Sequence, residues 1–416
     1  MQTNSMRRKS ILNNQIFLFF LLMPYFKPAS LQYIAPMIES LFELWKVGST
    51  LIIFSLYVFY YHRLSKMILA ITVYEFALFF STIIAYGNYW KLVVSCGTII
   101  GFCMLTELCL NRNCKRYFSV VYHIYFLLIL INFVMLLIYP HGIAADSYYH
   151  NKYNFLGIDN GLAVDVMVPL MAISCIYSAF RGKKLMYSAL LMLAMISATV
   201  LITWSATGVV AWFIMIAYIL FIYKGRFTKY FNSYALFATS MVLQVMIVFL
   251  RVQEYFAFII EDILRKSITL TGRTEIWDMT YPIILQSPIF GHGVYEGHGL
   301  VIWHDSYMYS HNAILEIMTQ GGIIALVLFA IPFIMAAVRL YKCRRHFLSG
   351  IVTVTLFTFL VTYLVEAQIT AIWVFGFLMM ASCIPNIIQQ YEDYALRTNM
   401  VANRFYGKNR TLRPDW

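Results

Sequence analysis

An arginine and a histidine lie towards the two ends of a polar stretch in a chain that is otherwise very apolar. Arg273 follows Gly272, and a permanently charged, forked guanidinium is suited to binding phosphate or pyrophosphate. His311 stands directly before a long apolar run, and an imidazole there can accept a proton from a hydroxyl near neutral pH. Ordinary roles are also open, since Arg273 can reach lipid headgroups and His311 can hydrogen-bond the start of a helix. The pair is therefore a candidate anion site with a candidate base.

Two further polar residues accompany His311. Asn312 follows it directly, and Glu316 lies four residues beyond Asn312, so that the two side chains share one face of a helix. A carboxylate this close to a membrane is costly unless it is paired or used. The histidines of this stretch lack the close spacing and the accompanying cysteines or carboxylates of zinc sites, so we expect no metal and no cofactor.

The composition indicates a membrane protein. Hydrophobic residues make up 61% of the chain, charged residues 12%, and the mean hydropathy is +0.71, whereas a soluble domain is about one-quarter charged. Apolar runs that approach the ~20 residues of a membrane-spanning helix recur throughout. The sequence therefore predicts an all-α, polytopic integral membrane protein that forms a single transmembrane domain over residues 1–416.

Twelve apolar runs are predicted to span the membrane. They are residues 16–26, 47–61, 67–86, 90–110, 117–139, 162–180, 185–203, 208–223, 230–250, 313–338, 347–365 and 370–388. The longest connection, residues 251–312, is predicted to be one large extracytoplasmic loop, whose first part has the spacing of a helix lying along the membrane surface. Residues 389–416 are predicted to form a polar, basic cytoplasmic tail.

The charge pattern orients the chain. The net charge is +12, and the basic residues fall in the short connections between alternate apolar runs, as in cytoplasmic loops of membrane proteins. We therefore expect a multi-pass membrane protein with both termini in the cytoplasm, and we expect no nucleic-acid partner. Glu75 and Glu107 lie inside predicted spans, where pairing or protonation is the ordinary explanation and proton-coupled transport the alternative.

The polar stretch and its surroundings resemble the O-antigen ligase and polymerase family of bacterial envelope proteins, of the Wzy type. The resemblance covers mainly residues 155–332 and depends on the order and spacing of several short motifs. These motifs are Gly157 and Asn160, Ser205 and Gly208, Gly272-Arg273 with Trp277, Pro288 with Gly291 and Gly293, His311-Asn312, and Gly321-Gly322-Ile323.

The resemblance implies a glycosyltransferase that works on glycans carried by undecaprenyl pyrophosphate. Arg273 would stabilise the departing pyrophosphate, and His311, together with Glu316, would accept the proton of the acceptor hydroxyl. Gly272, Trp277, Asn312 and Asn160 would line the substrate site. The implied reaction is inverting and metal-independent. Its partners are lipid-linked oligosaccharides and membrane lipid, and a chain-length co-polymerase is an open possibility.

One departure from the family pattern bears on the choice of reaction. Many relatives, ligases especially, carry an arginine beside the serine of the stretch that here reads Ser205-Ala206-Thr207. A second phosphate-binding cation must then come from elsewhere, and Arg251, Lys266 and Lys152 are the candidates. The departure favours a polymerase of capsule, exopolysaccharide or O-antigen over a ligase, which is the first alternative. A polysaccharide flippase, with no chemistry, is the alternative of another class.

Overall fold

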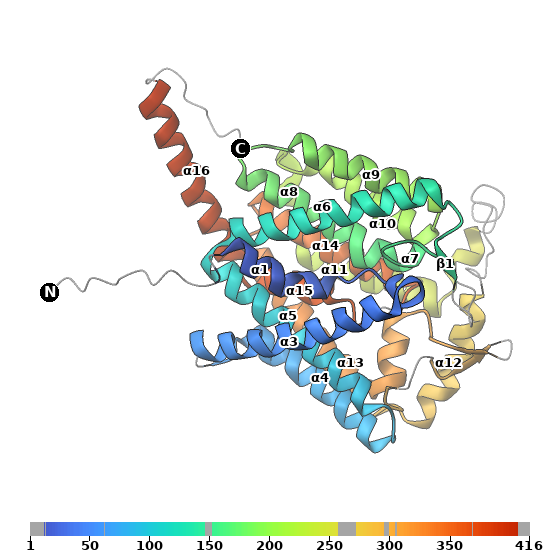
Figure 1. The fold of residues 1–416 in the computed structure, drawn as a ribbon. Coiled ribbons are helices and arrows are strands. Elements are labelled where there is room, and N and C mark those ends of the chain that lie inside the picture. Colours follow the sequence, from blue (N-terminus) through green and yellow to red (C-terminus); the bar gives the residue numbers. More distant parts are fainter. Residues whose placement is uncertain are drawn as a thin grey trace.

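A computed structural model describes residues 12, 14–61, 63–145, 152–256, 272–294, 299–303, 306–367 and 369–406. Most of these residues are helical, so the predicted all-α class is confirmed. Figure 1 shows the long helices packed side by side in one bundle, with α12 and its neighbouring segments at one end and α16 leaving the other.

The first half of the chain supplies the following elements. They are α1 Gln15–Leu22, η2 Met23–Phe26, α2 Leu31–Ile34, α3 Pro36–Tyr60, α4 Lys66–Ile84, α5 Tyr89–Arg112, α6 Cys114–Ile138, β1 Ala144–Ala145, β2 Lys152–Tyr153, α7 Asp159–Leu162, the π-helical turn η3 Ala163–Met167, α8 Val168–Phe180 and α9 Tyr187–Thr203. Strands β1 and β2 pair in antiparallel fashion, with Ala144 opposite Tyr153.

The second half supplies the remaining elements. They are α10 Ala206–Ala217, η4 Tyr218–Ile222, η5 Arg226–Tyr230, α11 Ser233–Gln244, η6 Val245–Phe249, η7 Val252–Phe256, α12 Arg273–Gln286, β3 Val301–Trp303, β4 Ser306–Met308, α13 Ala313–Lys342, α14 Phe347–Thr362, α15 Ile372–Ser382 and α16 Ile384–Tyr406. Strands β3 and β4 form a second antiparallel hairpin, with Val301 opposite Met308.

Each predicted span corresponds to an apolar helix or helix pair. Six helices of the described chain are long and apolar enough to cross a membrane, and the pair α15–α16, bent by 68°, makes a seventh candidate. Five shorter apolar helices, of 10–17 residues, account for the other predicted spans. The helical runs are thus as predicted, while the number of twelve crossings stays a prediction.

The helices differ in how far the protein surrounds them. The run from Asn160 to Phe180, which includes η3 and α8, is 94% buried, whereas α3 is only 22% buried. Helix α3 exposes large apolar side chains such as Leu51 and Phe59, as a lipid-facing helix does. The core of the bundle therefore lies around α8, which packs against α6, α10 and α14.

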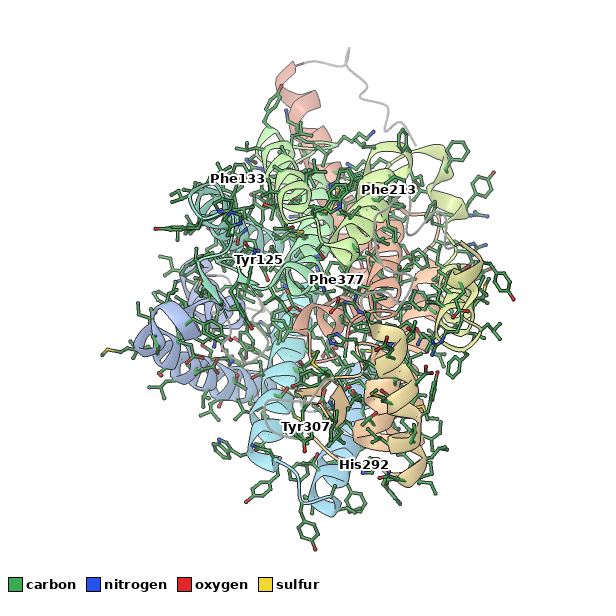
Figure 2. The ribbon with its side chains drawn as sticks, turned by 90° about the vertical axis from the view of Figure 1, so that its right-hand side faces the viewer. Tyr125, Phe133, Phe213, His292, Tyr307 and Phe377 are labelled. Carbon is green, nitrogen blue, oxygen red and sulfur yellow. The ribbon has the colours of Figure 1, made fainter. Side chains whose placement is uncertain are left out.

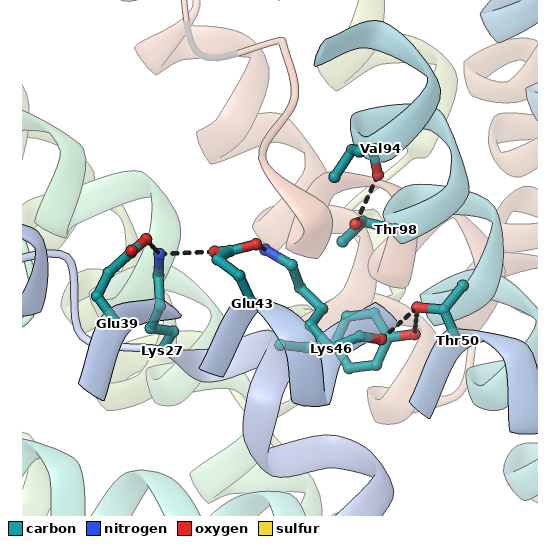
Figure 3. Close-up of polar contacts among 8 residues, drawn as sticks. Lys27, Glu39, Glu43, Lys46, Thr50, Val94 and Thr98 are labelled. Atoms are coloured by element: carbon teal, nitrogen blue, oxygen red, sulfur yellow. Dashed lines mark hydrogen bonds and ion pairs between the residues drawn. The ribbon is translucent and has the colours of Figure 1, made fainter. Parts of the chain in front are cut away.

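The start of α3 corrects one sequence boundary. The second span was predicted to begin at residue 47, but α3 begins at Pro36 and includes much of the expected connection. Its charged residues are paired, since Lys27 Nζ lies 2.6 Å from Glu43 Oε1 and Lys46 Nζ lies 2.6 Å from Glu43 Oε2 (Figure 3). This pairing lets charged residues occupy the first turns of a helix that continues into an apolar segment.

The acids inside the predicted spans meet uncharged donors. Tyr57 Oη donates to Glu107 Oε2 at 2.7 Å, and Cys96 Sγ donates to Glu75 Oε2 at 3.0 Å. Hydrogen bonds of this kind satisfy buried carboxyl groups within the protein. They fit the ordinary explanation of these two acids, in which their role is structural.

Helix α13 is broken in its middle, and a glycine-rich segment fills the break. Gly322 has φ 63° and ψ −164°, a backbone conformation that is essentially restricted to glycine. Residues 287–294, which we call the glycine splice, lie against this point. Four backbone bonds join the two segments: His292 N to Thr319 O (2.8 Å), Gly293 N to Gln320 O (2.8 Å), Ile323 N to Pro288 O (2.9 Å) and Ile324 N to Ile289 O (3.4 Å).

The fit between the two segments requires glycine on both sides. A Cβ atom on Gly322 would lie 2.2 Å from Ile289 O, and one on Gly291 would lie 2.5 Å from Gly321 N. The glycine splice also reaches α4, because Val294 N donates to Thr82 Oγ1 at 3.0 Å. Two of the resembling motifs are therefore complementary halves of one structural joint.

The predicted large loop has more structure than a loop. Within residues 251–312 the structure places η7, α12, the glycine splice and the β3–β4 hairpin. Figure 2 faces this end of the bundle and labels His292 and Tyr307 on it. The predicted surface helix before Gly272 falls largely on residues outside the described ones. The predicted tail is helical as far as Tyr406, because α16 continues through it.

Candidate active site

Three separate segments meet at Arg273. Arg273 is the first residue of α12, and Glu366 lies in the connection between α14 and α15. Arg273 Nη2 is 2.9 Å from Glu366 Oε1, and the two side chains are only 15% and 6% exposed. Thr207 Oγ1, in the first turn of α10, donates to the same carboxylate oxygen at 3.1 Å. The guanidinium is thus held at a junction of α12, α10 and the α14–α15 connection.

Gly272 sets the start of α12. Its φ of 82° is a left-handed conformation, and having no side chain it gives the first turn no side-chain cap. The helix dipole creates positive potential at this end of α12. The guanidinium of Arg273 adds a full charge at the same place, so this end of α12 is suited to an anion.

His311 lies directly before α13 in a strained backbone conformation. Its φ is +49°, which costs on the order of 1–3 kcal/mol for a residue with a side chain. The following residues hold this conformation. Asn312 Nδ2 donates to Leu364 O at 3.1 Å, and Ala313 N donates to Tyr363 O at 3.0 Å. These bonds attach the start of α13 to the same α14–α15 connection that carries Glu366.

The environment of His311 keeps its imidazole neutral. Burial, and then the nearby charge of Arg273, lower the pKa of His311 from 6.5 to about 4. The electrostatic effect requires the two side chains to be close in space. That Arg273 and His311 belong to one catalytic site stays a prediction. At neutral pH the imidazole has a free lone pair and can accept a proton.

Asn312 and Glu316 have structural partners. Asn312 Oδ1 accepts from Leu315 N at 3.0 Å, which caps α13. Glu316 Oε2 accepts from Ser310 N at 2.9 Å and from Ser310 Oγ at 2.8 Å, and its Oε1 accepts from Gln320 Nε2 at 2.8 Å. Glu316 therefore braces the turn that carries His311, and its place in the structure is that of a positioning residue.

Other predicted site residues lie around the junction with partners of their own. Arg251 Nη2 bonds Asp278 Oδ1 and, at 3.2 Å, Thr274 O, so that it stabilises the first turns of α12. Asn160 Oδ1 accepts a hydrogen bond from Ser205 Oγ, next to the start of α10. Lys152 is exposed in β2, and Lys266 lies outside the described residues.

Trp277 is part of the core. It is fully buried and packs with Val248, Ile284 and Leu315 in a small apolar cluster. An indole in that position is closed to a sugar ring, so the structure gives Trp277 a packing role. It fastens α12 to α13 and thereby fixes the position of Arg273 relative to His311.

Two acids of the junction escaped the sequence analysis. Glu366 pairs with Arg273, and burial raises its pKa while Arg273 and Thr207 counteract that effect. Asp165 lies in the π-helical turn η3, where its side chain is exposed although the neighbouring Val164 and Val166 are buried. Protein surrounds Asp165, yet its side chain keeps accessible surface, so Asp165 borders a space within the bundle.

Electrostatic interactions tie Asp165 to the junction. Its side chain is close enough to Glu366 and Tyr363 to interact with both electrostatically. π-Helical turns inside α-helices are frequent at functional sites. The available signal was the isolated acid in each of two apolar runs, GLAVDVMVPL and TYLVEAQIT.

The central part of the chain matches a family model. Residues 188–330 match the model named Wzy_C, which describes O-antigen ligase. This segment is therefore similar to the corresponding part of O-antigen ligases. It contains Arg273, His311, the glycine splice and the break in α13, so the predicted resemblance is confirmed where its motifs are densest. Asn160, Asp165 and Glu366 lie outside the matched residues. No curated protein and no solved structure matches the chain.

Proposed function

We propose that this chain is a membrane glycosyltransferase that polymerises oligosaccharide repeat units carried on undecaprenyl pyrophosphate. The product is a surface polysaccharide, and the reaction takes place at the outer face of the cytoplasmic membrane. The observation that carries the proposal is the meeting of Arg273, the start of α12 and a neutral His311 within the segment that matches the O-antigen ligase model. A co-polymerase that sets chain length is the protein partner we expect.

The proposed reaction is one displacement at the anomeric carbon of the donor sugar. The acceptor hydroxyl oxygen forms a bond to that carbon, and the bond from the carbon to the phosphate oxygen breaks. Undecaprenyl pyrophosphate leaves with the bonding electrons, and the hydroxyl proton passes to His311. Attack from the face opposite the leaving group inverts the anomeric configuration.

Positive potential at the leaving group is the main contribution of the protein. Charge develops on the bridging phosphate oxygen as the bond breaks, and preorganised donors in a water-poor site stabilise such charge best. Arg273 and the start of α12 supply these donors. Pyrophosphate is already a good leaving group, so the proposal needs neither a general acid nor a metal for this step.

The donor itself would tune His311. Burial and the charge of Arg273 lower the pKa of His311 and make it a weak base. A pyrophosphate bound at Arg273 brings negative charge, and a nearby negative charge raises the pKa of an imidazole. His311 would therefore become a better base when the donor is in place.

Glu366 would occupy the guanidinium of Arg273 until the donor displaces it. The carboxylate of Glu366 pairs with Arg273 in the structure. An incoming pyrophosphate offers the same guanidinium a more highly charged partner. Glu366 then keeps Arg273 oriented before the donor binds. After the reaction it competes with undecaprenyl pyrophosphate for Arg273 and so helps the carrier to dissociate.

The description of the matched family favours ligation as a second candidate. A ligase would pass a finished lipid-linked glycan to a different acceptor, using the same displacement and the same residues. The two candidate reactions differ in the acceptor molecule. The acceptor would be recognised by residues other than Arg273 and His311, so this pair does not distinguish the two reactions. The choice of polymerase depends on the departure at Ala206-Thr207.

Chain growth from purified lipid-linked repeat units tests the proposal. The protein in lipid nanodiscs should convert single units into a ladder, and Arg273→Ala and His311→Ala should each abolish the ladder. Asp278→Asn, which alters an exposed acid on the same helix, is the control and should retain it. A ladder of normal length from either alanine variant would remove that residue from the mechanism.

The cellular lipid profile separates the candidates. Loss of a polymerase leaves single repeat units on the carrier, whereas loss of a ligase leaves long lipid-linked chains. A transporter would yield no ladder from the wild-type protein in the purified system, which would refute the enzymatic proposal as a whole.

A further inference from the structure

A polar cavity lies at the end of the bundle opposite α12. It has a volume of about 510 Å³ and is enclosed by the turn between α5 and α6, the end of α8 and the first turns of α16. Figure 1 shows α16 leaving the bundle at this end. By the charge pattern of the sequence, this end faces the cytoplasm. The proposed chemistry takes place at the other end and makes no use of this cavity.

The walls of the cavity carry an excess of positive charge. Arg112, Lys115 and Arg397 line it, together with a single carboxylate, that of Asp393. Within the described ranges none of the three cations forms an ion pair with a carboxylate. Uncompensated positive charge around a concave polar surface is the condition for binding an anion.

Two of the cations are positioned by aromatic rings. The guanidinium carbon of Arg112 lies 3.6 Å from the ring centroid of Tyr60, and Lys115 Nζ lies 3.7 Å from that of Tyr394. Such contacts hold a cation in place without removing its net charge. The cations are thus partly ordered before any ligand arrives.

The cavity wall is fixed by hydrogen bonds between α16 and the α5–α6 turn. Gln390 Nε2 donates to Leu110 O at 2.8 Å, and its Oε1 accepts from Cys114 N at 2.9 Å. Asn386 Nδ2 donates to Asn111 Oδ1 at 2.6 Å. Gln390 therefore serves the end of α5 and the start of α6 at once. This preorganisation reduces the conformational entropy that a ligand would have to remove.

We propose that this cavity binds a phosphate-bearing anion and that the bound anion links α16 to the α5–α6 turn. Three cations opposed by one carboxylate match a phosphate group, and the carboxamides of Asn386 and Gln390 supply further polar contacts. A cavity of this size holds more than a bare phosphate. Basic pockets between transmembrane helices on the cytoplasmic side commonly receive lipid headgroups.

The cavity lies beside a bend of the chain. Helix α16 leaves α15 at an angle of 68°. An anionic headgroup of the inner leaflet and a free phosphate offer the same chemistry to the cavity. The experiment therefore uses one probe for each source.

Binding to the full chain in uncharged detergent tests the proposal. The probes are dioctanoyl phosphatidylglycerol and inorganic phosphate, with zwitterionic dioctanoyl phosphatidylcholine as the comparison. We expect at least one anionic probe to bind, at least tenfold more tightly than phosphatidylcholine, with an affinity that falls as salt is raised. Binding of phosphatidylglycerol alone identifies a lipid headgroup as the ligand, and comparable binding of phosphate identifies the free anion.

Variants locate the binding. Arg112→Gln, Lys115→Gln and Arg397→Gln should each weaken binding about tenfold, which corresponds to ~1.4 kcal/mol. Asp393→Asn should strengthen binding severalfold, a gain that misfolding would not produce. The control is Arg345→Gln, an exposed cation in the turn after α13 that does not line the cavity.

Three results would overturn the proposal: neither anion binds, the cavity variants bind as the wild type does, or Arg345→Gln weakens binding equally. Chain growth from lipid-linked repeat units should be unchanged in Arg112→Gln. This arm keeps the cavity separate from the proposed glycosyl transfer, because either can fail without the other.

Discussion

Replacement of Glu366 by glutamine should destabilise the protein and tighten anion binding at the same time. The substitution keeps the size of the side chain and its ability to accept a hydrogen bond from Thr207, but it removes the negative charge beside Arg273. Arg273 then keeps its charge in a site where its side chain is only 15% exposed.

The expected magnitude follows from the burial of the pair. Removal of one partner of a buried ion pair costs on the order of 3–5 kcal/mol. Glutamine still offers a neutral oxygen to Arg273, so a cost below that range, about 2–3 kcal/mol, is expected for Glu366→Gln. The same helix provides a contrast, since Arg251 pairs with Asp278, whose side chain is 62% exposed. Asp278→Asn should cost less than ~1 kcal/mol.

Two measurements separate these effects. Reversible unfolding in detergent gives the loss of stability for both single variants and for the double variant Arg273→Gln/Glu366→Gln. The double variant should be more stable than Glu366→Gln, because it no longer buries an unpaired guanidinium. Titration with inorganic pyrophosphate should show about tenfold tighter binding to Glu366→Gln and weaker binding to Arg273→Gln.

The reasoning fails on either of two outcomes. Equal destabilisation by Glu366→Gln and Asp278→Asn would show that burial of the first pair has no energetic weight. Unchanged or weaker pyrophosphate binding by Glu366→Gln would show that this carboxylate does not compete with an anion for Arg273.

Three further expectations concern the supports of the site. Gly322→Ala should destabilise the fold by about 3 kcal/mol or more in the same unfolding assay, since its Cβ would meet a backbone oxygen at 2.2 Å. The control is Gly48→Ala, which has open space around it and should be neutral or slightly stabilising. The pKa of His311 is lowered in the folded state to about 4, so the unfolded chain binds more protons than the folded one between about pH 4 and 6.5. The free energy of unfolding should therefore be greatest above pH 6.5 and should fall towards pH 4. His311→Gln should flatten this part of the pH profile. Trp277→Ala should cost ~3–5 kcal/mol, while Trp277→Phe should retain most of the stability, because no hydrogen-bond partner of the indole N–H is found among the described residues.

Hydropathy was sufficient to predict the helices. Each apolar run became a helix because a backbone in an apolar environment must satisfy its own hydrogen bonds. The boundaries were less accurate where charges were paired locally. Helix α3 begins at Pro36 because Lys27 and Lys46 neutralise Glu43, and no hydropathy profile contains that pairing.

The site was predictable in its two principal residues and not in their partners. Arg273 and His311 stand beside recognisable motifs of their own segments. Glu366 is brought to them by a connection more than fifty residues beyond His311, and Asp165 by a different helix. Long-range proximity of this kind is set by helix packing, which a single sequence does not reveal. Trp277 illustrates the converse, since an aromatic residue expected to face a sugar proved to be part of the core.

The interlocked backbone of α13 and residues 287–294 has an evolutionary consequence. All four hydrogen bonds between residues 287–294 and α13 depend on one alignment of the two segments. Inserting or deleting a single residue in either segment would displace the donors from their acceptors. Among homologous sequences, the number of residues from Pro288 to Gly293 should therefore be invariant, even where the surrounding extramembrane segments differ in length. Variation in that count among functional relatives would mean that the joint can be built in more than one way.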